Sequence, residues 1–264
     1  IESHYGKTIQ EIESDGFTIA ATMPLSCEAS QPYGTAQAIG NSTAALGPIL
    51  DEIQPDLVLI YGDRFEAFSA MVAATQMNIP TAHIEGGDLT DGGALDDTIR
   101  HAMTKLAHLH FTTNAEAQQR VLKLGEEPWR VFNTGFPTID LIQAGNYTDP
   151  DTLLETYQLT LEKPLILMTQ HAISTEPDQA EKQIQATLNA IARCDEAGIQ
   201  TVITYPNNDA GGEVIIDALN AFIKSPQLNH VQIHPSLGRR HYHGMLNLCG
   251  RLGKGVCVGN PPAD

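Results

Sequence analysis

The chain has 264 residues, 42% of them hydrophobic, and a formal net charge of −17 from 32 acidic and 15 basic residues. A field of this sign repels polyanions, so the sequence predicts a protein that does not bind nucleic acid. No run of 18 apolar residues and no secretory signal is visible, and the four cysteines form no CxxC pair. We therefore expect a cytoplasmic protein with reduced thiols and no membrane span.

The first half of the chain alternates apolar runs with amphipathic segments. Short apolar runs rich in branched residues predict buried strands over residues 56–61, 79–84, 109–113 and 129–135. Helical spacing of apolar residues predicts helices over residues 64–77, 96–107 and 114–123. Acids suit the start of a helix, where Asp96 and Asp97 lie, and Asn114 is a residue type that caps helices.

The pattern restarts after a polar stretch, residues 145–164. Strands are predicted over 165–169, 199–206 and 230–237, and helices over 178–197, 212–223 and 239–249, with Gly198 as the C-cap of the first helix. Strand–helix alternation is typical of parallel sheets of the doubly wound type. Two such series predict two α/β domains, residues 1–146 and 147–264.

Ligands of open parallel sheets bind at the carboxyl ends of the strands, where two acids of the first domain lie. Asp63, followed by Arg64, comes after the first strand, and Glu85, followed by two glycines, comes after the second. Two carboxylates at the ends of adjacent strands suit acid–base chemistry, and the arginine suits a phosphate. The structural alternatives are an N-capping Asp63 beside a surface Arg64, and a solvated loop acid at Glu85.

Charged residues also cluster at the start of the helix that follows. The i, i+4 spacing places Asp96 by Arg100 and Asp97 by His101. The cluster belongs either to a site or to an ordinary helix start with two ion pairs.

In the second domain, His171 and Asn207 follow strands in the segments TQHAIS and YPNNDAGG. A histidine in such a loop can act as an acid or base near neutral pH, and the amide can contact a ligand. The alternatives are a structural histidine and a polar turn capped by Asp209. The dinucleotide pattern GxGxxG and the Walker pattern are both absent, which disfavours dinucleotide and P-loop chemistry.

The motifs GDRF, HIEGG, DD-x-x-RHA, TKLAH, MTQHA, YPNNDAGG and SLGRRHY together resemble the hydrolysing UDP-N-acetylglucosamine 2-epimerases, which include bacterial sialic-acid pathway enzymes. The resemblance runs across essentially the whole chain. Arg64 and the Asp96-Asp97…Arg100-His101 pattern favour the hydrolysing branch over its non-hydrolysing relatives.

This resemblance implies two Rossmann-like domains of the glycosyltransferase-B type with the active site between them. It implies elimination of UDP from UDP-N-acetylglucosamine through 2-acetamidoglucal, then hydration to N-acetylmannosamine. No metal or other cofactor is required, and family members are commonly homo-oligomers, here expected as dimers or tetramers. Carried over by position, the catalytic set is Asp63, Glu85, Asp96 and His171. The substrate-binding set is Arg64, Arg100, His101, Gln170, Asn207, Gly259 and Asn260.

The sequence departs from the family near its end. VGNPPAD keeps Gly259 and Asn260 but has Pro261 and Pro262 where the family has two serines. Proline lacks the N–H and the hydroxyl that would hold a diphosphate. The family's first strand and the remainder of its second domain also have no counterpart, so we expect a truncated member with an incomplete second domain.

Three alternatives stay open at this point. The substrate can be a UDP-linked 2,4-diacetamido-2,4,6-trideoxy sugar, because such enzymes share these motifs. The chain can be an inactive nucleotide-sugar-binding protein, which the lost serines favour and the retained acids disfavour. The fold also admits a glycosyltransferase, which would need an acceptor and would leave carbon 2 unexchanged.

Overall fold

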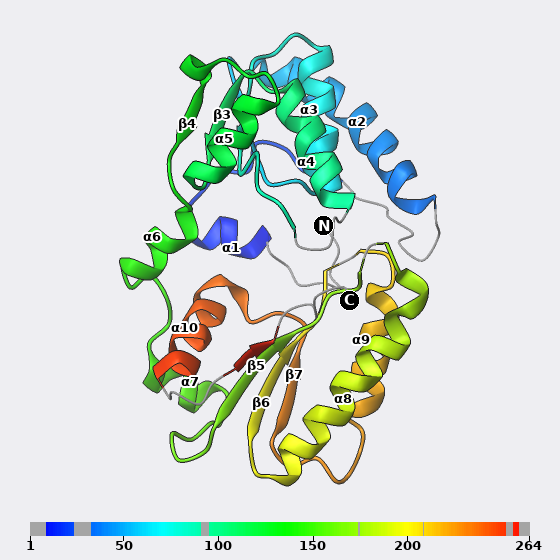
Figure 1. The fold of residues 1–264 in the computed structure, drawn as a ribbon, viewed down its shortest axis with the longest axis vertical. Helices are drawn as coiled ribbons and strands as arrows, with labels where there is room; N and C mark the ends of the chain where they lie inside the picture. Colours follow the sequence, from blue (N-terminus) through cyan, green and yellow to red (C-terminus); the bar gives the residue numbers. More distant parts are fainter. Residues whose placement is uncertain are drawn as a thin grey trace. The chain divides into compact units, whose positions relative to one another are not determined.

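The computed structural model describes residues 9–23, 33–90, 95–173, 175–207, 209–251 and 256–258. Within them the chain divides into two compact units (Figure 1). The first unit contains Ala20–Asp140, and the second unit joins Ile1–Ile19 to Leu141–Pro262. The short helix α1 (Ile9–Ser14) therefore belongs to the second unit. None of the described helices combines the length and the apolar character needed to cross a membrane.

The first unit contains a four-stranded parallel sheet in the order β1-β2-β3-β4. Its strands are β1 (Val58–Tyr61), β2 (Thr81–Ile84), β3 (Leu109–Thr112) and β4 (Val131–Asn133). Each lies within a predicted strand, and the parallel pairing confirms the prediction from the alternating pattern.

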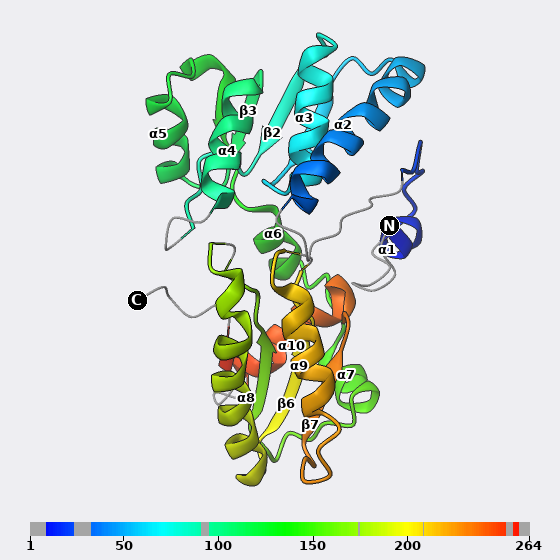
Figure 2. The ribbon, with the colours of Figure 1, turned by 90° about the vertical axis from the view of Figure 1, so that its right-hand side faces the viewer.

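Three helices of the first unit, α3 (Phe65–Gln76), α4 (Leu95–Leu106) and α5 (Ala115–Lys123), follow the strands as predicted (Figure 2). Helix α2 (Gly34–Ile53), which precedes β1, the 3-10 turn η2 (Pro128–Arg130) and helix α6 (Pro137–Gln143) were not predicted. Ile60 of β1 packs with Met71 and Met103 from α3 and α4 to form the main core. Asn114 is the N-cap of α5, as predicted, because its side chain accepts a hydrogen bond from the backbone N–H of Ala117 at 2.8 Å.

One buried carboxylate ties several of these elements together. Glu126 accepts hydrogen bonds from Lys105 of α4 and from His110 of β3 at 3.2 Å, and it forms an ion pair with Arg130 of η2 at 2.5 Å. Burial opposes its charge, but the three donors outweigh burial and lower the pKa of Glu126. Burial also lowers the pKa of His110, to about 4, so the imidazole is neutral at pH 7.

The second unit contains a four-stranded parallel sheet in the order β7-β6-β5-β8. Its strands are β5 (Leu165–Thr169), β6 (Gln200–Thr204), β7 (Val231–His234) and β8 (Val256–Val258). Its helices are α7 (Pro150–Thr156), η3 (Pro177–Gln179), α8 (Ala180–Glu196), α9 (Gly212–Phe222) and α10 (Gly238–Arg251).

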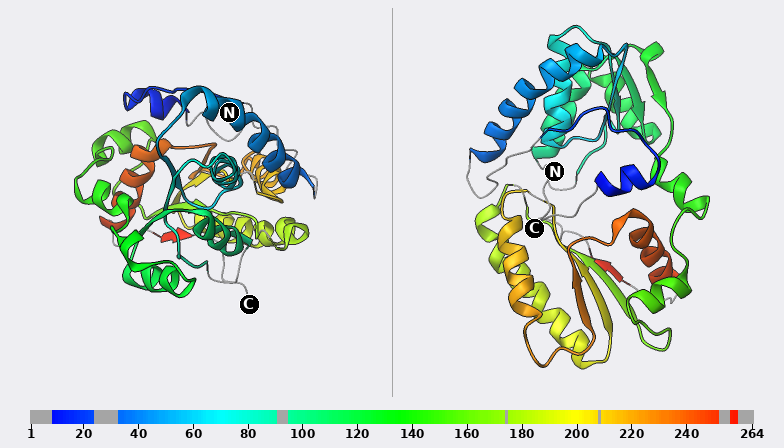
Figure 3. Two further views of the ribbon diagram at one scale, coloured as in Figure 1. Left: turned by 90° about the horizontal axis from the view of Figure 1, so that it is seen from above. Right: turned by 180° about the vertical axis from the view of Figure 1, so that it is seen from behind.

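Both faces of this second sheet are covered, as in a doubly wound fold. Ile166 and Met168 pack with Ile184 and other residues of α8 and α9 on one face. Leu165 and Leu167, which alternate with them along β5, pack on the other face against α7 and α10. The same two layers are visible on opposite sides of the sheet in Figure 1 and, from behind, in Figure 3.

Candidate functional site

The first two strands bring Asp63 and Glu85 to the same edge of the first sheet. Tyr61 and Ile84, the last residues of β1 and β2, are paired in register. Gly62, with a φ of +74°, turns the chain after β1 and donates its N–H to the carbonyl of Ile84 at 3.2 Å. The predicted adjacency of these two strand ends is thus confirmed.

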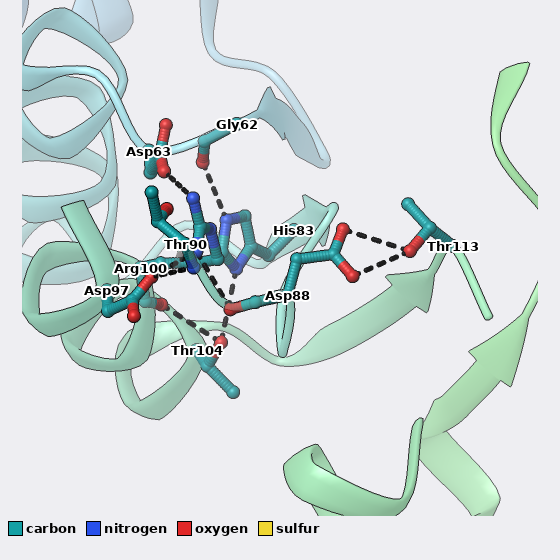
Figure 4. A network of polar contacts seen from close by, with 9 residues as sticks. All are labelled: Gly62, Asp63, His83, Asp88, Thr90, Asp97, Arg100, Thr104 and Thr113. Carbon is teal, nitrogen blue, oxygen red and sulfur yellow. Dashed lines mark hydrogen bonds and ion pairs between the residues drawn. The ribbon is translucent and has the colours of Figure 1, made fainter. Parts of the chain in front are cut away.

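Arg100 of α4 organises this edge (Figure 4). Its guanidinium donates to the carboxylate of Asp63, to Asp97 at 2.8 Å and to the carbonyl of Asp88 at 2.8 Å. The Arg100 side chain is 11% exposed and that of Asp63 20% exposed, so solvent screens the pair weakly. The bond with Asp97 has i, i+3 spacing, which the i, i+4 rule did not predict.

The loop after β2 is held from two helices. Its backbone carbonyls at Gly87 and Asp88 accept hydrogen bonds from Arg120 of α5 and Arg100 of α4. The Asp88 carboxylate accepts from the hydroxyl of Thr113 at 2.8 and 2.9 Å, and the N–H of Thr90 donates to Asp97 at 2.8 Å. These bonds fix the loop, which begins at Glu85, before any ligand binds.

The two glycines of this loop are needed for close packing. A Cβ at Gly87, whose φ is +87°, would lie 2.4 Å from the carbonyl oxygen of Ala117. A Cβ at Gly86 would lie 3.0 Å from Oγ1 of Thr104 and 3.1 Å from Nδ1 of His83. The glycines therefore let α4 and α5 approach the loop that begins at Glu85.

His83 is a member of this network that the sequence did not single out. It is fully buried, and burial lowers its pKa. Its Nε2 contacts the carbonyl of Gly62 at 2.8 Å, which requires the proton on Nε2 and leaves Nδ1 toward Thr104 at 3.4 Å. His83 thus fastens the Gly62 turn, which precedes Asp63.

Glu85 itself has a φ of +69°, a left-handed conformation that non-glycine residues rarely adopt. Its carboxylate accepts a hydrogen bond from the hydroxyl of Tyr61. Burial raises the pKa of Glu85, the Tyr61 hydrogen bond opposes that rise, and the carboxylates of Asp88 and Asp63 add to it. A carboxyl group with a raised pKa can take and return protons nearer to neutral pH than an ordinary glutamate.

The second unit positions His171 and Asn207 at adjacent strand ends. The backbone N–H of Asn207 donates to Nδ1 of His171 at 3.1 Å, which places the proton of the neutral ring on Nε2. The side-chain amide of Asn207 donates to Asp209 at 2.6 Å. A Cβ at Gly212 would lie 2.6 Å from the carbonyl oxygen of Asn207, so the glycine lets α9 begin against this turn. Gln170, which precedes His171, is buried.

Other predicted site residues lie as follows. Arg64 is the N-cap of α3, pairs with Glu66 at 3.1 Å and has 44% of its side chain exposed. Asp96 lies in the first turn of α4, and Nδ1 of His101 is buried without a hydrogen-bond partner among the described residues. Gly259 and Asn260 lie outside the described residues.

Two structural alternatives from the sequence named the wrong capping residue. The N-cap of α3 is Arg64 rather than Asp63, and the N-cap of α9 is Gly211 rather than Asp209. Within the part of the chain that the structure describes, no group of three or more His, Cys, Asp or Glu side chains is arranged to hold a metal ion.

A comparison with known protein families shows which family the chain belongs to. Residues 2–251 match the family described as UDP-N-acetylglucosamine 2-epimerase. The chain belongs to this family. The resemblance read from the motifs is therefore confirmed at the level of the family.

Individual relatives in this epimerase family are distant. The chain is 30% identical to a UDP-N,N′-diacetylbacillosamine 2-epimerase (hydrolyzing) of Legionella pneumophila, over 88% of this chain and 60% of that protein. It is also 30% identical to a UDP-N-acetylglucosamine 2-epimerase of Neisseria meningitidis, over 81% of this chain and 55% of that protein. The chain thus spans about three-fifths of the length of these relatives.

A solved structure shares the fold of this family member. The crystal structure of a UDP-GlcNAc 2-epimerase from Neisseria meningitidis bound to UDP-GlcNAc superposes with a TM-score of 0.68, at 18% identity, over 96% of this chain and 66% of that chain. Together with the two parallel sheets, this confirms the predicted two-domain α/β fold.

Proposed function

We propose that this chain is a hydrolysing 2-epimerase that converts UDP-N-acetylglucosamine and water to N-acetylmannosamine and UDP. The observation that carries the proposal is the pair of carboxylates, Asp63 and Glu85, at the ends of two adjacent parallel strands, in two different electrostatic settings. Membership of the 2-epimerase family supports a UDP-sugar as the substrate.

The chemistry needs groups that take and return protons at carbon 2. Asp63 forms an ion pair with Arg100. The pKa of Glu85 is raised, mainly by burial, so this carboxyl group can exchange a proton. We assign proton removal from carbon 2 to Glu85 and leave a second acid–base role to Asp63, Asp96 or His171.

The proposed reaction balances in two steps. Glu85 takes the carbon-2 proton, the carbon-1–oxygen bond breaks with its electron pair going to UDP, and a carbon-1–carbon-2 double bond forms. Water then adds its oxygen to carbon 1 and gives one proton to a second acid–base group of the site, which delivers a proton to carbon 2 from the opposite face. The proton taken by Glu85 passes to solvent. His171 carries a proton on Nε2. In this scheme, that proton can pass to the departing UDP or to carbon 2.

The arginines are assigned different roles. Arg100 is largely buried and bonded to two carboxylates, which favours a positioning role for it. Arg64 has a side chain that is 44% exposed, and a guanidinium fork suits a diphosphate. We therefore propose that Arg64, rather than Arg100, meets the substrate's phosphates.

A second candidate substrate is a UDP-linked 2,4-diacetamido-2,4,6-trideoxy sugar. It is favoured by the similarity to the Legionella pneumophila protein, whose name specifies UDP-N,N′-diacetylbacillosamine. The same two steps at carbons 1 and 2 apply to it, since the difference lies at carbons 4 and 6.

The test is proton NMR of the chain with each UDP-sugar in D₂O. We expect free 2-epimerised sugar with deuterium at carbon 2, together with UDP. Glu85→Gln should lower the rate about 10²- to 10⁴-fold, the usual loss for a missing general base. The matched control Glu116→Gln, on an exposed turn of α5, should keep the rate.

Two outcomes contradict the proposal. If both sugars stay intact but bind saturably, with the same affinity in Glu85→Gln, the chain is a nucleotide-sugar-binding protein. If UDP is released while carbon 2 keeps its proton, the chemistry is a transfer or simple hydrolysis rather than an epimerisation.

A further inference from the structure

The carboxylate of Glu85 meets a residue that no motif singled out, Tyr61. Tyr61 is the last residue of β1 and is paired in register with Ile84, the last residue of β2. Its hydroxyl donates a hydrogen bond to Oε1 of Glu85. The two side chains thus come from neighbouring strands, 24 residues apart in the sequence.

The backbone of Glu85 makes this contact attainable. Side chains alternate between the two faces of a strand, so Glu85 in a regular strand would share the face of His83. His83 pairs with Ile60, and both are buried on the face where Thr104 of α4 contacts His83. Tyr61 follows Ile60 and points to the other face. The left-handed φ of +69° breaks the alternation at Glu85, and its carboxylate reaches Tyr61.

The remaining groups around this pair have opposing effects on the charge of Glu85. Burial and the carboxylates of Asp88 and Asp63 favour the protonated form, while Arg100 and the Tyr61 hydroxyl favour the ionised form. Tyr61 in turn faces Asp88 and Thr138 of α6. Tyr61 is 53% exposed, but burial of the rest of its side chain, with Glu85 beside it, raises its pKa, so the phenol remains a donor throughout the neutral range.

We propose that Tyr61 is a positioning residue that holds the Glu85 carboxylate ionised and in one orientation for proton removal from the sugar, an inference that rests on the function proposed above. Tyr61 does not touch the reacting carbon in this scheme. It acts through Glu85, by a hydrogen bond to the ionised form that the protonated form makes less well.

The first measurement does not depend on turnover. The ionisation of Glu85 is followed by carbon-13 NMR of glutamate carboxyl groups in the wild-type chain and in Tyr61→Phe, with Glu85→Gln assigning the signal. Loss of the donor should move the Glu85 titration to higher pH. Tyr33→Phe removes a hydroxyl from a tyrosine that is 58% exposed and should leave the titration unchanged. Circular dichroism checks that each variant is folded.

The second measurement is the pH dependence of turnover. In Tyr61→Phe, kcat/KM near neutral pH should fall about 10- to 100-fold, the usual loss of a hydrogen bond to a charged group, with most of the loss in kcat. The acidic limb of the profile should move to higher pH in parallel with the NMR titration. A purely structural role would lower the rate at every pH and leave the limb in place.

The two readouts separate the failure of this inference from the failure of the proposed function. An unchanged Glu85 titration in Tyr61→Phe overturns the inference, whether or not the chain turns over a sugar. A shifted titration in a chain without turnover would keep the Tyr61–Glu85 coupling but overturn both the epimerase function and the catalytic part of this inference.

Discussion

Asp63 and Arg100 form an ion pair that joins the loop after β1 to the second turn of α4, although the two residues are 37 positions apart. The pair is weakly screened because both side chains are at least four-fifths buried. Arg100 also holds the carboxylate of Asp97 and the backbone of Asp88. One side chain thus joins both strand-end loops to one helix.

Replacing Arg100 by leucine should destabilise the first unit. Asp63 and Asp97 would lose the guanidinium that both carboxylates contact, and breaking a buried pair in this way costs about 3–5 kcal/mol. Urea unfolding followed by circular dichroism measures the change. The control Lys123→Met, at an exposed position of α5, should change the free energy of unfolding by less than about 0.5 kcal/mol. An equally small change in the free energy of unfolding for Arg100→Leu would show that the Arg100 ion pairs do not stabilise the fold.

Two glycines with positive φ should differ in their tolerance of alanine. Gly87 and Gly125 have φ of +87° and +92°, so alanine at either position costs about 1–2 kcal/mol from the backbone. A Cβ at Gly87 also meets the Ala117 carbonyl at 2.4 Å, whereas nothing lies within 4 Å at Gly125. We expect Gly87→Ala to lower the free energy of unfolding by clearly more than Gly125→Ala. Equal losses would mean that α5 moves away from the loop at little cost.

The buried His110 should make the first unit sensitive to acid. Its pKa is about 4 when folded against an ordinary value near 6.5, so the unfolded chain gains a proton first as the pH falls. Stability should therefore decrease from about pH 6.5 down to pH 4, by roughly 3 kcal/mol from this group. Glu126, whose pKa is lowered, adds a loss in the same direction as the pH falls further.

The variant His110→Gln isolates this effect. It removes the titrating group, so its free energy of unfolding should fall less between pH 7 and pH 5 than that of the wild type. Urea titrations at the two pH values give the comparison. The same slope in both proteins would mean that His110 keeps its ordinary pKa in the folded chain.

His171 should matter for turnover more than for stability. It lies in a loop, is only partly buried and accepts a hydrogen bond from the backbone N–H of Asn207. His171→Gln should lower the rate of sugar release about 10²- to 10⁴-fold if the ring transfers a proton. Its free energy of unfolding in urea should change by no more than an ordinary surface substitution does, about 0.5 kcal/mol. A normal rate in this variant would remove His171 from the catalytic set.

Strands β1 to β7 could be predicted from the sequence because apolar runs and turns repeat regularly, whereas β8 and the order of the strands in the sheets were not predicted. Parallel pairing then placed Asp63 and Glu85 at one edge without further information. The partners of these acids were not predictable. Arg100 lies 37 residues after Asp63 and Tyr61 24 residues before Glu85, so no local spacing rule relates them.

Helix α2 shows a second limit of sequence reasoning. It contains Gly40, Gly47 and Pro48, which all disfavour a helix interior, and the sequence analysis predicted no helix there. Packing against α3 stabilises this helix despite its low intrinsic helix propensity, because Leu50 is buried against Ala73 and Ala74. Tertiary contacts of this kind are visible only in the folded chain.

The left-handed backbone at Glu85 has a consequence for protein engineering. This conformation costs a glutamate about 1 kcal/mol or more that a glycine or asparagine would not incur. A redesign that ranks residues by backbone strain alone will therefore favour replacing Glu85. If the proposed role of Glu85 is correct, a thermostabilised version of this chain must hold position 85 fixed, because the substitution that relieves the backbone also removes the carboxylate.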